Sequence, residues 1–288
     1  ISAVNELNIV NSNNYAGNIV RNIVSVDAVA EADIAPWLVS RFLVREQLAD
    51  NRFLSPDFSA SAEIKPFKES NLLAKASISK NSKIPALNDL YWMPGGNPEL
   101  GEESGICSEI SFEMVNALSG SLIIKNDLAF FRNNIRDIIQ WHPGEFSYWE
   151  ADNLDNLLTS GIEANVDVNY TSSHFNFRLI AGYSFTRASG ENDIDRHLFP
   201  EGNQHIYVPI NQVNTMTRVT WRHFYSTFRI NYTDRRFLTP DNTQYLPEYS
   251  VSDLDIGLRL NTKKSSIGFT FTVENIFNIN YQNIAYYP

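Results

Sequence analysis

The feature that most constrains the fold of this chain is a side-chain period of two that extends over much of its length. In residues 162–170, apolar side chains alternate with Glu, Asn and Asp, and residues 175–185 place Phe, Leu, Ala and Tyr opposite Asn, Arg and Ser. Similar alternation covers residues 253–261 and 267–274. Because successive side chains of a β-strand point to opposite faces, this pattern predicts strands with one apolar and one polar face.

The strands are long, and the connections between them alternate in length. We predict about twelve strands of roughly 10–13 residues, which exceeds the usual globular strand and matches a tilted strand that crosses a bilayer. Short links are predicted near residues 34–36, 66–70, 117–120, 171–174, 222–223 and 262–265. Long links are predicted near residues 82–105, 133–158, 187–209 and 235–249, and a link of medium length near residues 48–56. Outer-membrane barrels show this asymmetry, since their periplasmic turns are short and their extracellular loops are long.

The two faces can be assigned in two ways. In a soluble β-sandwich the apolar face is the core, whereas in a large membrane barrel it meets lipid and the polar face lines the lumen. Strand length and loop asymmetry favour the barrel. The polar side chains then assigned to the lumen, facing water or a plug, are Glu163, Asp167, Arg178, Arg229, Asp253, Asp255 and Arg259. The alternation is blurred over residues 37–47, and the Asn-rich residues 1–20 indicate an ordered loop or a partial strand.

Composition and motifs argue against several other classes. The formal net charge of −10 disfavours nucleic-acid binding, which needs a basic surface. The single cysteine, Cys107, excludes an intrachain disulfide framework. No nucleophile elbow, P-loop or dinucleotide-binding motif is present. None of the five histidines has the spacing of a metal site; they are His142, His174, His197, His205 and His223. We therefore predict no enzyme activity, no resident metal and no cofactor.

Several segments, in order along the chain, resemble TonB-dependent outer-membrane receptors. Residues 84–92 (IPALNDLYW) and 96–100 (GNPEL) are similar to a strand end followed by a G-N-P run in that family. Residues 130–139 (FFRNNIRDII) are similar to another strand end, and residues 273–281 (VENIFNINY) to a V-x-N-L-F-D-x-x-Y run. Further matches are Gly161-Ile162-Glu163 and Tyr183-Ser184-Phe185-Thr186-Arg187-Ala188. One departure is Gly101-Glu102-Glu103, where the family has Pro-Glu. The resemblance is closest to the cobalamin and siderophore branch, especially receptors of the Bacteroides group.

The resemblance implies an all-β, antiparallel transmembrane barrel of about 22 strands, occluded by an N-terminal plug. Residues 1–288 would form part of this single barrel domain, from the tenth to the twenty-first strand, without the plug and the final strand. The implied location is the Gram-negative outer membrane. The implied partners are the TonB complex, outer-membrane lipid and a small-molecule ligand such as cobalamin or a ferric siderophore. A surface lipoprotein is a further candidate partner.

Aromatic residues of the predicted long loops are the candidates for ligand binding, because a flat ligand could stack on them. These residues are Tyr91, Trp92, Trp141, Phe146, Tyr148 and Trp149. Packing within the loops or at the membrane interface is the alternative role for the same side chains. Two other functions stay open at this stage: a passive porin-like channel and a soluble carbohydrate-binding β-protein. A barrel enzyme would need a Ser/His/Asp-type set on adjacent strands, and the sequence shows none.

Overall fold

The protein is built on a single antiparallel sheet. The computed structural model describes residues 1–15, 17–67, 71–143, 148–154, 156–191, 202–262 and 264–285. The sheet has 14 strands, of which only β4 lies off a path that joins the others in chain order. The strands are β1 (Ser2–Val10), β2 (Ile19–Ala35), β3 (Leu38–Ala49), β4 (Arg52–Phe53), β5 (Asp57–Ile64), β6 (Leu72–Lys83), β7 (Glu103–Ser119), β8 (Leu122–Arg136), β11 (Asn156–Thr171), β12 (Phe175–Glu191), β13 (Asn211–Trp221), β14 (Phe224–Thr233), β17 (Tyr249–Asn261) and β18 (Ser266–Val273).

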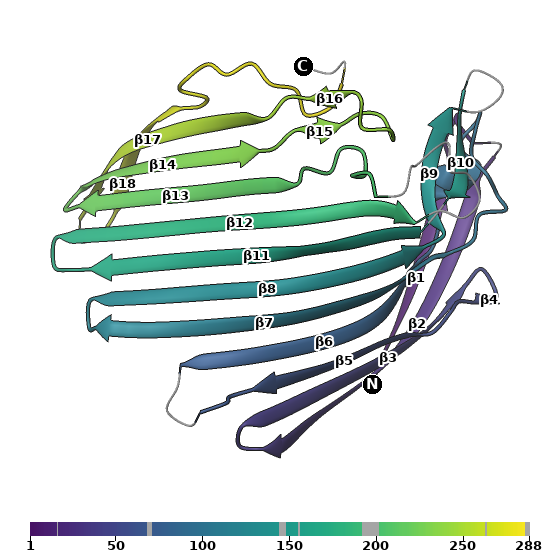
Figure 1. Cartoon of the computed structure of the whole chain (residues 1–288), viewed down its shortest axis with the longest axis horizontal. Helices are drawn as coiled ribbons and strands as arrows, with labels where there is room; N and C mark the ends of the chain where they lie inside the picture. The colour runs from purple at the N-terminus through teal and green to yellow at the C-terminus, as the bar shows by residue number, and fades with distance from the viewer. Residues whose placement is uncertain are drawn as a thin grey trace.

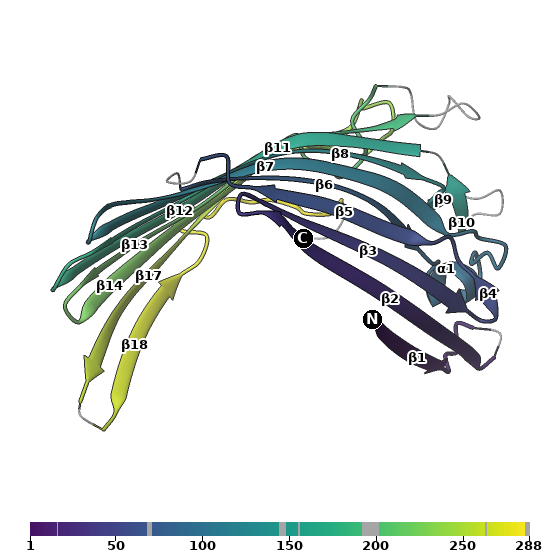
Figure 2. The same ribbon diagram turned by 90° about the horizontal axis from the view of Figure 1, so that it is seen from below.

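The sheet is an open, strongly curved wall with two different ends (Figures 1 and 2). Short hairpin turns gather at one end, which we call the hairpin end. The long connections gather at the other, the loop end, together with the remaining small elements. These elements are α1 (Leu87–Tyr91), β9 (Ile138–Pro143), β10 (Trp149–Leu154), β15 (Arg236–Phe237) and β16 (Tyr245–Leu246). The predicted alternation of short and long connections is therefore confirmed.

The register of the sheet separates two chemically different faces. On one face, charged side chains of neighbouring strands form ion pairs, such as Arg45 to Asp27 at 2.6 Å, Lys75 to Glu113 at 3.0 Å and Arg178 to Asp167 at 2.9 Å. On the other face, Ile162 lies between Phe130 of β8 and Phe185 of β12. We call these the polar face and the apolar face.

Among the described residues, the main sheet forms no hydrophobic core of its own. The buried apolar residues among those described are Leu90, Leu100, Ala151, Ala188 and Leu246, which belong to the loop end. By contrast, Phe271 is 68% exposed and Ile110 is 53% exposed on the apolar face. A soluble sandwich would bury such a face against a second sheet, so this arrangement is that of a membrane barrel wall rather than a sandwich.

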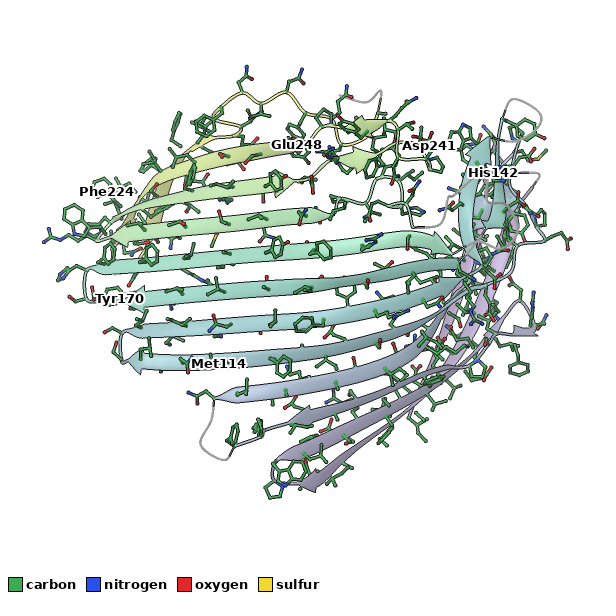
Figure 3. All side chains as sticks on the ribbon, in the orientation of Figure 1. Met114, His142, Tyr170, Phe224, Asp241 and Glu248 are labelled. Atoms are coloured by element: carbon green, nitrogen blue, oxygen red, sulfur yellow. The ribbon has the colours of Figure 1, made fainter. Side chains whose placement is uncertain are left out.

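Aromatic side chains mark the hairpin end of the apolar face. Phe175, Trp221 and Phe224 occupy one cross-strand row, and the ring of Tyr170 lies 6.2 Å from that of Phe175. Tyr170 and Phe224 are labelled at this end in Figure 3. Such a girdle is typical of a membrane–water interface, where an aromatic body meets lipid and its edge meets water. Among the described residues, no helix has the length and hydropathy to cross a bilayer.

Two parts of the sequence fold differently from their pattern. Residues 1–20 contain a full strand, β1, which pairs with β2 from Ser2 opposite Asp27 to Val10 opposite Ile19 and adds to the predicted strands. Hydrogen-bonded pairing with β2 stabilises β1, and the side-chain pattern of residues 1–20 alone does not indicate this pairing. In residues 37–47, Leu43 of β3 and its partner Val29 of β2 interrupt a polar face that carries Arg41 and Arg45, which explains the blurred alternation.

The run at residues 273–281 forms a tight turn after β18. Asn275 and Asn278 have φ values of 48° and 49°, a left-handed conformation that Asn tolerates better than most residues. The Asn275 side chain accepts from the Ile279 amide at 2.8 Å and donates to its carbonyl at 2.9 Å. The Asn275 amide donates to Asp253 at 2.8 Å, which fixes the turn to β17. The asparagines of this motif therefore shape the backbone.

Candidate functional site

The long connections at the loop end are hydrogen-bonded to one another in sequence around the sheet. Met93 donates its amide to Asn14 at 2.8 Å, and Ala151 donates to Gly95 at 2.9 Å. Further around, Gln140 and His205 are joined at 2.8 Å, and Tyr207 donates to Phe237 at 2.9 Å. Arg236 then donates to the carbonyl of Gln282 at 2.9 Å. The loops thus form a continuous rim, in which each connection restrains its neighbour.

A small apolar cluster organises one sector of this rim, which we call the loop platform (α1, residues 92–101, β9 and β10). Leu90, Leu100 and Ala151 are its buried centre, and Tyr91 and Trp141 pack against it with Ile139. The Trp141 indole donates to Asp89 Oδ1 at 3.0 Å, while Asp89 Oδ2 accepts from the Ala86 amide at 2.9 Å. The short helix therefore depends on an acidic residue that also anchors the tryptophan.

Gly95 permits the close approach of the two halves of the platform. Its φ is 110°, and an added Cβ would lie 1.9 Å from the carbonyl oxygen of Trp149 and 3.1 Å from the Trp141 ring. Only glycine combines this backbone conformation with such proximity. The segment that carries Trp92 is thereby held directly against the strand that carries Trp149.

Polar side chains complete the platform. His142 Nε2 lies 2.7 Å from Asp152 Oδ2, and Asn97 donates to Asp152 Oδ1 at 3.0 Å. Asn153 donates to the carbonyl of Asp137 at 2.7 Å and accepts from the Gly101 amide at 2.7 Å. None of Asp89, Asn97, Asp152 and Asn153 was predicted from the sequence as a site residue. For Asp89 and Asn97 the signal was present, since both belong to the motif runs at residues 84–100.

The structure divides the predicted ligand-binding aromatics into two groups. Tyr91 and Trp141 pack into the platform, while Tyr148 is half-buried. Trp92 and Trp149 are 37% and 59% exposed on adjoining segments of the platform. Phe146 lies outside the described residues, as does His197. Ligand contact thus stays a prediction, most favourable for Trp92 and Trp149.

The family model with the description "TonB dependent receptor-like, beta-barrel" matches residues 37–279. The chain belongs to this family. It is 37% identical over 89 residues to the vitamin B12 transporter BtuB of Vibrio vulnificus, a match that covers 31% of this chain and 14% of that protein. It is 31% identical over 102 residues to the BtuB of Photobacterium profundum, covering 32% and 16% of the two proteins.

Solved receptors share the fold of this chain. The siderophore receptor PirA from Pseudomonas aeruginosa superposes with a TM-score of 0.70 at 15% identity, over 96% of this chain and 47% of PirA. The copper transporter OprC gives a TM-score of 0.69 at 10% identity, over 91% of this chain and 42% of OprC. The chain therefore spans less than half the length of these receptors. At such identities the likeness shows the fold alone.

In a TonB-dependent receptor barrel the apolar face meets lipid and the polar face lines the lumen, with the loop end outside the cell. All the side chains predicted to line the lumen lie on the polar face. Asp167 pairs with Arg178, and Asp255 pairs with Arg229 while accepting from Thr272 at 2.9 Å. Glu163 and Arg259 are exposed. Contact of any of these residues with a plug stays a prediction.

Within the described ranges, no group of three or more His, Cys, Asp or Glu side chains could hold a metal ion.

Protonation of His205 should loosen the rim between two loops. Burial lowers the pKa of His205 below its ordinary value of 6.5. Its Nδ1 lies 3.1 Å from the Ile206 carbonyl and its Nε2 faces the Gln140 amide, which fits the neutral ring. Because the folded pKa is the lower one, the stabilisation is complete above about pH 6.5 and is lost as pH falls through the folded pKa. Hydrogen exchange of residues 138–142 and 202–208 should therefore accelerate as pH falls below the ordinary histidine pKa of 6.5 and through the lower pKa of His205.

The control for this prediction is His174, which lies in a turn at the opposite, hairpin end. A His174→Ala variant should keep the pH-dependent acceleration, and a His205→Gln variant should lose it. An exchange rate of the two loops that does not change with pH, after correction for intrinsic exchange, would contradict the role given to His205.

Proposed function

We propose that this chain is the C-terminal part of the barrel of an outer-membrane active transporter for a scarce nutrient, with cobalamin as the leading ligand class. The sequence similarity to two proteins named vitamin B12 transporters supports this choice. A ferric siderophore is the second candidate, because several structural neighbours are named siderophore receptors. Their low identities make that support weaker.

The observation that carries the proposal is the loop platform with its exposed Trp92 and Trp149. Both tryptophans stand on segments fixed by hydrogen bonds and by the apolar cluster of Leu90, Leu100 and Ala151. A pre-organised aromatic surface binds a flat, rigid ligand without a large entropic cost of ordering side chains. Its position at the loop end puts it where a ligand arrives from outside the cell.

Transport in this proposal would follow the order implied by the family. Ligand binds at the loop end, the rim of loops tightens around it, and the TonB complex then rearranges a plug inside the barrel. The 288 residues supply the barrel wall and the loops, so contact with TonB would run through other parts of the protein. A surface lipoprotein that covers the loop end is a further proposed partner. No enzyme activity is proposed for the chain.

Binding by the full-length product of this gene, purified in detergent, tests the proposal. We expect cyanocobalamin to bind, and the double variant Trp92→Ala/Trp149→Ala to bind roughly tenfold or more weakly, since each stacked ring contributes about 0.5–1.5 kcal/mol beyond its area. The control is Trp221→Ala, which removes from the hairpin end a tryptophan that is 55% exposed, close to the 59% of Trp149. Binding should be titrated by tryptophan quenching and confirmed by calorimetry.

Binding of a ferric siderophore in place of cyanocobalamin would support the proposed transport function and replace cobalamin as the ligand class. Absence of binding to both classes, with open-channel conductance in planar bilayers, would favour the passive porin instead. Equal losses for the loop-platform variant and for Trp221→Ala would contradict the loop platform as the site.

A further inference from the structure

The charges of the sheet are distributed unequally between its two faces. From β5 to β18, every strand carboxylate of the main sheet whose side chain the structure describes lies on the polar face. These are Asp57, Glu63, Glu103, Glu109, Glu113, Asp127, Glu163, Asp167, Asp253 and Asp255. The apolar face of the same strands carries cations instead, namely Lys80, Arg132, Arg136 and Arg187. Although the chain has a formal net charge of −10, all the described charged side chains on the apolar face of these strands, from β5 to β18, are cations.

Two of these cations share a cross-strand row. Ser160 of β11 lies opposite Arg132 of β8 on one side and opposite Arg187 of β12 on the other. Adjacent strands are about 4.8 Å apart, so the two arginine backbones are separated by roughly 10 Å. Arg187 donates to the Gly202 carbonyl at 3.3 Å. Among the described residues, neither arginine forms an ion pair.

The row lies at the depth of the outer headgroups. Arg132 comes ten residues after Leu122, the first residue of β8 at the hairpin end. A rise of about 3.4 Å per residue and a tilt of about 40° place it roughly 26 Å above that end, which equals the height of the apolar band of such barrels. A lipid-facing arginine at this depth is tolerated and can meet headgroup phosphate, whereas at mid-bilayer it would be costly.

A groove opens on the apolar face directly beside Arg132. Its volume is about 610 Å³, and Arg132 is part of its lining. It spans two neighbouring rows: one runs from Phe42 through Ala60, Ile78 and Ser108 to Arg132, and the other from Ser40 through Ala62, Ala76 and Ile110 to Phe130. Small side chains at the middle of these rows make the hollow, and Phe42, Ile110 and Phe130 form its walls.

We propose that this surface is a binding site for a phosphorylated lipid of the outer leaflet. The phosphate lies between Arg132 and Arg187, and an acyl chain fills the groove over Ala60, Ala62 and Ala76. Guanidinium groups suit this role because they present several N–H donors to phosphate oxygens. From β5 to β18, no described strand carboxylate lies on this face to repel an anionic headgroup, and Glu46 of β3 is the described carboxylate on the remaining part of the face. The site is separate from the loop platform and does not depend on which nutrient is transported.

The test uses the full-length protein in vesicles of zwitterionic phosphatidylcholine that contain a small fraction of diphosphorylated lipid A. After extraction in mild detergent, native mass spectrometry counts the lipid A molecules that stay bound. We expect Arg132→Gln/Arg187→Gln to retain about tenfold less lipid A than the unsubstituted protein, since two cations near the headgroup are lost. The control Lys125→Gln removes a cation from the polar face of β8 and should retain lipid A fully.

A second pair of variants tests the groove without changing charge. Ala62→Leu/Ala76→Leu fills it and should reduce retention several-fold, while Ala28→Leu, on the apolar face of β2 away from the groove, should not. Equal retention of lipid A and its dephosphorylated form would overturn the proposal. So would full retention by Arg132→Gln/Arg187→Gln, or displacement of the lipid by inorganic phosphate alone at millimolar concentration.

Discussion

Replacing Leu179 with arginine should destabilise the folded barrel by about 2–4 kcal/mol, because it places a charge in the lipid-facing band. Leu179 lies on the apolar face of β12, between Val168 and Thr217 of the neighbouring strands. The adjacent Ile180 points to the polar face, directly opposite Asp167. Ile180→Arg should therefore cost much less, although it changes a residue of similar size. Urea unfolding of the full-length protein in phospholipid vesicles measures both values.

The same contrast is expected on β18. Phe271 is 68% exposed on the apolar face, and Thr270 lies on the polar face, where its hydroxyl bonds to Tyr225. Phe271→Arg should match the loss at Leu179, and Thr270→Arg should be tolerated much better. If both faces tolerated arginine equally on both strands, the assignment of the apolar face to lipid would be wrong.

A valine at Gly161 should destabilise the sheet at the upper end of the roughly 1–3 kcal/mol expected for overpacking. A Cβ at this position would lie 2.2 Å from the Phe185 carbonyl oxygen and 2.6 Å from the edge of the Phe131 ring. The ring of Phe131 covers the glycine from the opposite strand, a cross-strand arrangement that stabilises glycine within sheets. Because one of the clashing atoms belongs to the backbone, rotation of a side chain cannot relieve the contact.

The control for Gly161→Val is Gly268→Ala, also on the polar face but with open space around it. That substitution should be neutral or stabilising by up to about 1 kcal/mol, since alanine loses less backbone entropy than glycine. Comparable losses at Gly161 and Gly268 would show that glycine is needed for flexibility and not for the approach of Phe131.

The alternation of residues 162–170 and 175–185 was sufficient to predict the strands, their faces and the hairpin between them. This works because side-chain direction in a strand depends on parity alone, and each of these strands must be apolar on one side. The lengths of the connections could be predicted equally well, since turn segments interrupt the alternation. The motif runs predicted the family, and the match of the family model to residues 37–279 confirms it.

The loop end was less predictable, and its aromatic residues show why. Nothing in the sequence separates Trp141, which packs on Leu90 and bonds to Asp89, from Trp149, which is exposed. Their burial depends on contacts between connections that are far apart in the chain. Similarly, β1 is a strand because β2 offers it an edge, and not because residues 2–10 alternate.

The sequence by itself determined the period, the polarity of each face and the order of short and long connections, because these are local properties of the backbone and its side chains. Only the tertiary structure decided which loops are in contact, which tryptophans stay exposed, and that Arg132 and Arg187 lie in one cross-strand row beside a groove. These properties follow from the register between strands and from contacts between distant segments. Pairing energy across the whole sheet selects both, and no single segment encodes them.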